Sequence, residues 1–134
     1  MNIDTYHMRS QVEALLRDVG LGECELLIVD SVHDWAEDNG RPRVSPFLAA
    51  LAATRSDGVP FIVLHRCITE DVRASVISGM NLRGFAEEAE QLKEPSAFLE
   101  HLILHEAAHL LLPTGTSEDD CDRWAFERLT GRIQ

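Results

Sequence analysis

A chain of 134 residues, 45% of them hydrophobic and 26% charged, can bury one hydrophobic core and is too short for two ordinary domains. Its net charge of −11, from 23 acidic and 12 basic residues, argues against a protein that holds nucleic acid by neutralising phosphates. The same charge disfavours an anionic membrane surface. We therefore expect residues 1–134 to form a single domain with neither nucleic acid nor a membrane as its partner.

The cysteines and the N-terminus indicate a reducing compartment. Cys24, Cys67 and Cys121 lie far apart, and their odd number without a CxxC pair argues against a disulfide framework. The first ten residues lack the basic and apolar regions of an export signal. The longest apolar-rich stretch, residues 98–112, is interrupted by His101, His105, Glu106 and His109, so that no membrane span is expected. The predicted location is the cytoplasm.

The first third of the chain predicts one helix, one strand and a polar segment. Apolar residues recur at helical spacing from Tyr6 to Val19, and glycines follow, which indicates an amphipathic helix. Leu26–Val29 is aliphatic and partly β-branched, as in a buried strand. Residues 32–40 are polar and end in Asn-Gly, so they form a short helical turn or a loop.

The middle of the chain is ambiguous between helix and strand. The alanines of Phe47–Thr54 favour a helix, whereas the turn residues 56–58, followed by the apolar run Phe61–Leu64, favour a hairpin. We expect the hairpin.

Helices dominate the rest of the chain. Thr69 can cap a helix that runs to about Ile77, and residues 81–93 form a second, acidic helical stretch. Pro95 begins a third helix, which ends at Leu112 before a proline. Ser117 can cap a last helix that runs to about residue 129. The expected fold class is α+β, with a short sheet beside the third helix.

One motif carries recognisable chemistry. His105-Glu106-Ala107-Ala108-His109 matches the HExxH pattern, in which two histidines one helical turn apart can bind one metal ion. Glu106 lies about 100° from His105 around the helix, so its carboxylate can reach a water beside the metal without being a ligand. Hydrolysis needs this arrangement, because the metal lowers the pKa of the water and the carboxylate takes its proton. The motif predicts a zinc (Zn²⁺) site with Glu106 as general base.

The surroundings of the motif support a metal. Apolar residues between 102 and 112 cover nearly the whole circumference of the helix, which indicates burial on most sides. Buried polar groups need partners, because each unpaired one costs about 1–3 kcal/mol. A zinc ion would supply that partner, and a metal-free network of His and Glu hydrogen bonds is the alternative. His101 lies one turn earlier, too far for the same ion, so we expect it in the core or bonded to a ligand.

The last predicted helix offers the third ligand that a catalytic zinc site needs. On a helical wheel, two of its acids, Glu118 and Asp122, share the side of the apolar residues Cys121, Ala125 and Leu129. We expect Glu118 to bind the metal with His105 and His109. Asp122 would accept a hydrogen bond from the non-metal nitrogen of a ligand histidine. The alternative for Glu118 is an ordinary acid stabilised by the helix dipole, with another acid of this helix as the ligand.

Through these residues, the C-terminal part of the chain resembles a known family. LHEAAHLLL followed by EDDCDRWAFERL is similar to the ImmA/IrrE family of bacterial and phage zinc metallopeptidases, which are zincins of the gluzincin type. That family shows HExGH and then E-x-x-A/C-N/D-x-F-A, and the positions of the second segment are filled here by Glu118, Cys121, Asp122, Trp124 and Ala125. Ala108 stands where the family prefers glycine. The resemblance covers about residues 98–129.

The resemblance implies a zincin-like peptidase fold and, from several relatives, cleavage of a transcriptional repressor. Such a peptidase would bind its substrate as an extended strand on a sheet edge, for which Phe61–His65 is our candidate. It also needs a donor for the oxyanion, and the chemically able residues are Tyr6, His33, His65 and Arg66. We expect Cys121 to be an inert buried thiol, and Trp124 and Phe126 to lie in the core.

Three functions follow from these residues. The first is a zinc endopeptidase acting on an intracellular protein, such as a transcriptional repressor. The second is a non-catalytic regulatory module that keeps the fold and the zinc and binds a partner. The third is a metal-free helical regulator. Glu106 favours the first, because a structural zinc site does not require an unliganded carboxylate beside the metal. The charge of −11 would favour a basic partner.

Overall fold

The computed structural model describes residues 2–41 and 49–133, and this part of the chain has an α+β fold, as predicted. The strands are β1 (Ile3–Asp4), β2 (Glu25–Val29), β3 (Ala50–Thr54), β4 (Pro60–His65) and β5 (Cys67–Ile68). The α-helices are α1 (Arg9–Asp18), α2 (Val32–Asp38), α3 (Glu70–Leu82), α4 (Ala86–Ala89), α5 (Pro95–Leu111) and α6 (Glu118–Ile133). Two 3₁₀ helices, η1 (Thr5–Met8) and η2 (Glu90–Lys93), complete the described elements.

The main sheet has the strand order β2-β4-β3. β2 runs parallel to β4, with Leu27 opposite Val63, and β3 runs antiparallel to β4, with Ala52 opposite Ile62. The predicted hairpin is therefore confirmed for residues 50–64, and Gly58 takes the positive φ of 89° that its turn requires. Residues 47 and 48 of the predicted strand lie outside the described residues.

The prediction that Phe61–His65 forms a sheet edge is wrong. These residues belong to β4, which lies between β2 and β3 and is buried on both faces from Phe61 to Leu64. An unbroken apolar run is typical of a central strand, because both of its faces must be covered. β3 is the outer strand on this side of the sheet within the described residues, and it packs against α5.

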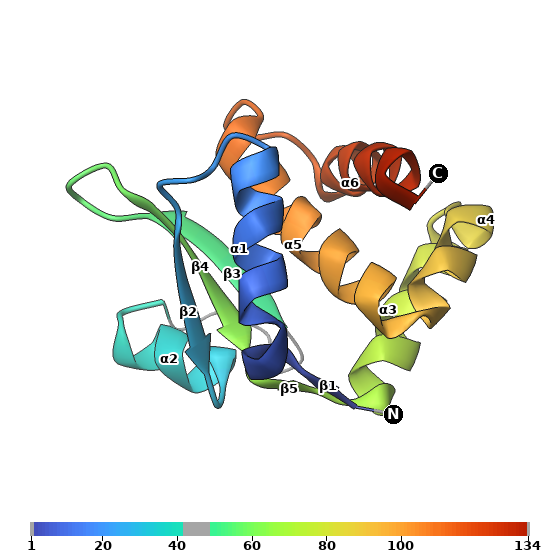
Figure 1. Cartoon of the computed structure of the whole chain (residues 1–134), viewed down its shortest axis with the longest axis horizontal. Coiled ribbons are helices and arrows are strands. Elements are labelled where there is room, and N and C mark those ends of the chain that lie inside the picture. Colours follow the sequence, from blue (N-terminus) through green and yellow to red (C-terminus); the bar gives the residue numbers. More distant parts are fainter. Residues whose placement is uncertain (1, 42–48, 134) are drawn as a thin grey trace.

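Helices cover both faces of the sheet (Figure 1). Residues of the three strands alternate between the faces, as their period of two requires. On one face Leu26, Ile62 and Leu64 pack in the main core with α1 and α5. On the other face Phe61 and Val63 form a smaller cluster around Val32 of α2.

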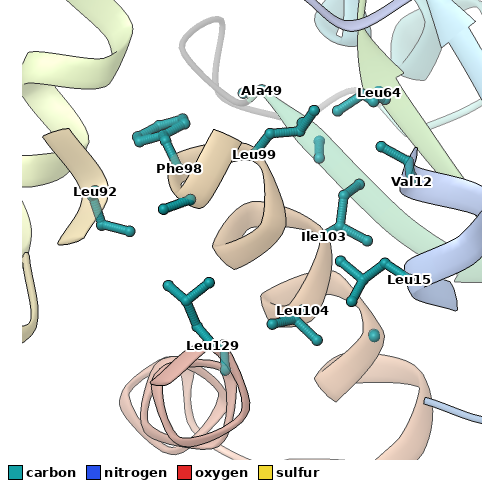
Figure 2. Packing of buried hydrophobic residues seen from close by; sticks show 14 of the residues in the cluster. Val12, Leu15, Ala49, Leu64, Leu92, Phe98, Leu99, Ile103, Leu104 and Leu129 are labelled. Atoms are coloured by element: carbon teal, nitrogen blue, oxygen red, sulfur yellow. The ribbon is translucent and has the colours of Figure 1, made fainter. Parts of the chain in front are cut away.

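Helix α5 is the centre of the main core. Figure 2 shows Phe98, Leu99, Ile103 and Leu104 of α5 between the strands, α1 and Leu129 of α6. The helix begins where Glu94 accepts a hydrogen bond from the backbone N–H of Ala97 at 2.8 Å, with proline in the first turn. The predicted bounds of this helix are confirmed to within one residue at its C-terminus. No helix in the described ranges is long and apolar enough to cross a membrane.

The other predicted helices are confirmed with shifted bounds. The first turn of the predicted Tyr6–Val19 helix is 3₁₀ rather than α, and the polar residues 32–40 contain the short helix α2, capped by Ser31. Thr69 caps α3, which continues five residues beyond the predicted end at Ile77. The predicted helix over 81–93 is instead the end of α3 followed by α4 and η2, because Gly84 has a φ of 90° and ends α3.

The position of α5 predicts the effect of a core truncation. Ile103→Ala should lower the free energy of unfolding by about 2–5 kcal/mol, because Ile103 is fully buried between the sheet and the helices. Leu82→Ala is the matched control: Leu82 is 86% exposed, and its truncation should change stability by less than about 0.5 kcal/mol. Urea unfolding followed by circular dichroism measures both. Equal losses for the two variants would contradict the central position of α5.

Candidate metal centre

The two histidines of HExxH and the first residue of α6 converge at one end of α5. His105 and His109 lie on the last two turns of α5, and a six-residue connection brings Glu118 back beside them. The connection turns sharply because Gly115 has a φ of 92°, and the backbone N–H of Thr116 donates to the carbonyl of Pro113 at 3.1 Å. The helix then starts at once, with the Ser117 hydroxyl accepting from a backbone N–H.

The distances between the three side chains suit a zinc ion. The Nε2 atoms of His105 and His109 are 3.2 Å apart. A carboxylate oxygen of Glu118 lies 2.7 Å from the first nitrogen and another lies 3.2 Å from the second. Donors bound to a tetrahedral zinc at 2.0–2.1 Å are separated by about 3.3 Å from one another. Two imidazoles and one carboxylate are also a usual donor set of catalytic zinc, so the residues present fit the metal.

Asp122 orients His105 from the side away from these donors. One oxygen of Asp122 lies 2.7 Å from Nδ1 of His105 and 3.2 Å from Nε2 of His101, and the other lies 2.6 Å from the Arg83 guanidinium. Asp122 is 2% exposed. Burial alone would raise its pKa, but the hydrogen bonds from both histidines and from Arg83 hold it far below the usual range. An ionised carboxylate only accepts hydrogen bonds, so Nδ1 of His105 is the donor.

His105 therefore presents Nε2 toward His109 and Glu118. Burial would lower the pKa of His105, but the hydrogen bond to Asp122 and the charges of Glu106, Asp122 and Glu118 raise it to about 9. At neutral pH the ring is therefore protonated and forms an ion pair with the Glu118 carboxylate, an oxygen of which lies 2.7 Å from Nε2. Metal binding would replace the Nε2 proton, because an imidazole coordinates only through an unprotonated nitrogen.

Glu106 lies between the metal ligands and the sheet. The residue is 6% exposed, and burial together with the negative charge of Glu118 raises its pKa to about 7, against the opposing effect of His105. The backbone N–H of Ala52 in β3 donates to its carboxylate. A carboxylate with a pKa near neutrality can both take and return a proton at physiological pH.

Two cavities adjoin the centre. The first, of about 440 Å³, is lined by β3 residues 50–52, by His105, Glu106 and His109, and by the turn 113–116 with Glu118. The second, of about 330 Å³, shares His105, Glu106 and Glu118 with the first. Most of its remaining wall is apolar, from Ala49, Val76, Met80, Phe98 and Leu102. The centre thus opens on one side along a strand and on the other into an apolar hollow.

The structure brings the five predicted site residues together but changes their exposure. Glu118, expected to point inward, has a side chain that is 66% exposed, and His109 is exposed as well. α5 is buried on most sides, as expected, except over its last turn, where Leu111 is 42% exposed. His109 of this turn also lines the first cavity.

The neighbouring predictions have mixed outcomes. His101 is buried and bonded to Asp122, as expected, and its ring packs on Phe126 at a centroid distance of 4.1 Å. Cys121 is fully buried, and its Sγ lies 3.8 Å from Nδ1 of His109, with burial raising the thiol pKa. Trp124 is partly buried at the edge of the core, under the Arg128 guanidinium.

None of the four candidate oxyanion donors is among the described residues that line the two cavities. Tyr6 is 58% exposed and lies against Arg66. His33 belongs to α2, on the opposite face of the sheet. Nδ1 of His65 accepts a hydrogen bond from the backbone N–H of Val32 at 3.3 Å.

Sequence reasoning missed Arg83 and Ala52. Arg83 follows α3, is 39 residues from its partner Asp122, and stands in no motif. Ala52 contributes a backbone group, which no side-chain pattern reveals. Both contacts depend on how the elements pack, so the sequence held no local signal for either.

No model of a known protein family matches this chain, and comparisons with curated proteins and with solved structures found no similar chain. The resemblance to the ImmA/IrrE peptidases therefore rests on the motifs of residues 98–129, beside which the geometry of the centre stands as an independent observation.

Proposed function

We propose that this chain is a zinc-dependent metallopeptidase that hydrolyses peptide bonds of an intracellular protein in the cytoplasm. The observation that carries the proposal is the arrangement at the end of α5. Three donors lie within zinc-binding distance of one another, and a buried carboxylate that is not needed as a ligand lies beside them. A structural zinc site is closed by four protein ligands, whereas this one offers three among the described residues and adjoins an open cavity.

The residues divide the work of hydrolysis between them. His105, His109 and Glu118 would hold the ion, which when bound supplies Lewis acidity and lowers the pKa of water. Glu106 would take the proton of the attacking water and return it to the leaving amine, because its buried carboxylate lies beside the metal ligands without being needed as one. Asp122 holds the ring of His105 in the orientation that binding requires.

The substrate would lie along β3. Ala50, Leu51 and Ala52 line the cavity beside Glu106, and within the described residues the outer edge of β3 has no strand paired to it. An extended peptide can add to such an edge through main-chain hydrogen bonds, which places a peptide bond near the metal ligands. A side chain next to that bond could enter the apolar second cavity.

As the substrate we propose a transcriptional repressor or a similar regulator, on the family resemblance. The charge of −11 agrees with a basic protein partner and opposes direct binding to nucleic acid, and raised salt should weaken the association.

One observation favours a second function. The oxyanion donors expected from the sequence do not line the cavities within the described residues. A non-catalytic regulatory module that keeps zinc and binds a partner would need no such donor. Stable binding of a partner without any cut would support this alternative.

The protein should bind about one zinc ion per chain. Glu118→Ala should weaken binding by at least about tenfold, because one of three ligands is lost. Glu127→Ala, on the same helix but away from the centre and solvent-exposed, should leave the affinity unchanged. Elemental analysis of protein purified without chelator, followed by competition with a zinc-binding dye, measures both. Absence of a transition metal, together with an unchanged melting temperature after chelation, would refute the proposed zinc site.

Glu106→Gln should keep zinc and abolish hydrolysis, since the amide has the same shape but cannot accept the proton. The measurement is incubation of both proteins with repressors encoded near the gene, in search of a discrete, chelator-sensitive cut. Efficient cleavage of unrelated casein-like chains would contradict a specific regulator as substrate. Cleavage by Glu106→Gln at the wild-type rate would refute Glu106 as the base.

The zinc-free protein should lose stability as the pH rises from about 5 to about 7. Because the pKa of Glu106 is about 7 when folded and near 4.5 when exposed, the unfolded chain releases this proton first. This loss in the free energy of unfolding is absent below the unfolded pKa and complete above the folded pKa, and it amounts to about 3 kcal/mol. Glu106→Gln should therefore be stabilising at pH 7.5 and nearly neutral at pH 5.

Urea unfolding of both chelator-treated proteins at the two pH values tests this expectation. His105 adds a loss of its own between about pH 6.5 and about pH 9, and part of that loss is already present at pH 7.5. A wild-type protein with the same stability at pH 5 and pH 7.5 would contradict the buried, protonatable Glu106.

A further inference from the structure

We propose that Arg83 is a positioning residue of the metal centre, which fixes the Asp122 carboxylate and through it the ring of His105. The inference rests on the proposed zinc site but concerns a residue outside the HExxH motif and outside α6. Arg83 is the C-terminal cap of α3, and its guanidinium reaches across to α6.

The contacts of Asp122 leave it little freedom. One carboxylate oxygen of Asp122 is hydrogen-bonded to both histidines of α5, at 2.7 Å from His105 and 3.2 Å from His101. The other oxygen accepts a hydrogen bond from Arg83 at 2.6 Å. With only the histidine contacts, the carboxylate could pivot about the oxygen that they share. The bond to Arg83 holds the opposite oxygen, so that the plane of the carboxylate is set.

Charge gives Arg83 a second role in the same contact. Asp122 is 2% exposed; its hydrogen-bond partners besides Arg83 are the two histidines, and the negative charge of Glu106 also acts on it. His101 is buried, and burial lowers its pKa against the opposing effect of Asp122, so that its charged form is disfavoured. If His105 gives up its proton to bind a metal, Arg83 is the permanent cation that remains bonded to Asp122. A buried carboxylate without such a partner is costly, so removal of Arg83 weakens the contact that orients His105.

The surroundings hold Arg83 in turn. Its backbone N–H bonds to the carbonyls of Gly79 and Met80 at the end of α3, and Gly84 then turns the chain with a φ of 90°. The guanidinium lies 5.8 Å from the centre of the Phe85 ring, and its other arm bonds to Asp119 at 2.7 Å. The guanidinium fork therefore has one arm on the buried acid and one arm on an exposed acid.

The two arms of the guanidinium suggest a test variant, a matched control and an intermediate variant. Arg83→Met removes both arms while keeping an unbranched apolar side chain. Asp119→Asn removes the charge under the outer arm and leaves the bond to Asp122 intact. Arg83→Lys keeps the positive charge but cannot hold two acids in a planar fork.

The experiment measures zinc affinity of the full chain by competition with a zinc-binding dye. Arg83→Met should bind zinc about 10–100-fold more weakly than wild type, the usual loss when a partner behind a ligand is removed. Asp119→Asn should stay within about threefold of wild type, and Arg83→Lys should fall between wild type and Arg83→Met. Urea unfolding of the chelator-treated proteins shows that each variant is folded.

A second readout needs no metal. In chelator-treated protein, the proton on Nδ1 of His105 should give a downfield NMR signal from its bond to Asp122, and this signal should shift or broaden in Arg83→Met but not in Asp119→Asn. Folded Arg83→Met with wild-type affinity and an unchanged signal would overturn the role of Arg83. If Arg83→Met does not fold, Arg83→Lys decides in the same way. A wild-type chain that binds no zinc overturns the proposed function, whereas the NMR signal still tests the Arg83 contact.

Discussion

A single buried carboxylate ties together the helices on which the candidate centre depends. Asp122 of α6 contacts two histidines of α5 and the cap of α3, so three elements distant in sequence meet at one side chain. Of these elements only α5 is fixed by the sheet, since it packs on β3 and on the main core. The contact at Asp122 therefore acts together with the apolar packing of Ala125 and Leu129 to hold α6 across α5, and with it the distance from Glu118 to the two histidines.

The buried polar groups of the centre lower the stability of the fold. Glu106 is a buried acid whose charged form is disfavoured, and His101 keeps a buried Nδ1 without a hydrogen-bond partner in the described part of the structure. Each is the kind of group that a purely structural core would replace by an apolar side chain. The apolar residues around them, such as Ile103 and Leu104, are fully buried, and the free energy gained by their burial offsets the cost of these polar groups.

Much of this arrangement could be predicted from local pattern. Periodicity and capping residues predicted the end of α5 and the start of α6, which flank the centre, to within a residue or two. The helical wheel placed Glu118 and Asp122 on the same face of α6. These successes share a cause: one helix face and one short connection are local properties of the chain. The strand order was missed, because β4 and β3 are both short apolar runs and their places in the sheet depend on pairing between distant segments. Arg83 was missed for the same reason.

The difference in exposure between the inner and outer parts of the centre has a consequence for metal entry. Asp122 and Glu106 are buried and Asp122 is held by three hydrogen bonds, whereas Glu118 is two-thirds exposed and lies at the start of a helix, beside the turn at Gly115. The inner residues can keep His105 oriented before any ion arrives, so little ordering is left for the binding step. Glu118 and His109 face solvent and can exchange water for metal without opening the core. A rigid inner side and an accessible outer side are what a site needs to bind its ion quickly and still hold it in one geometry.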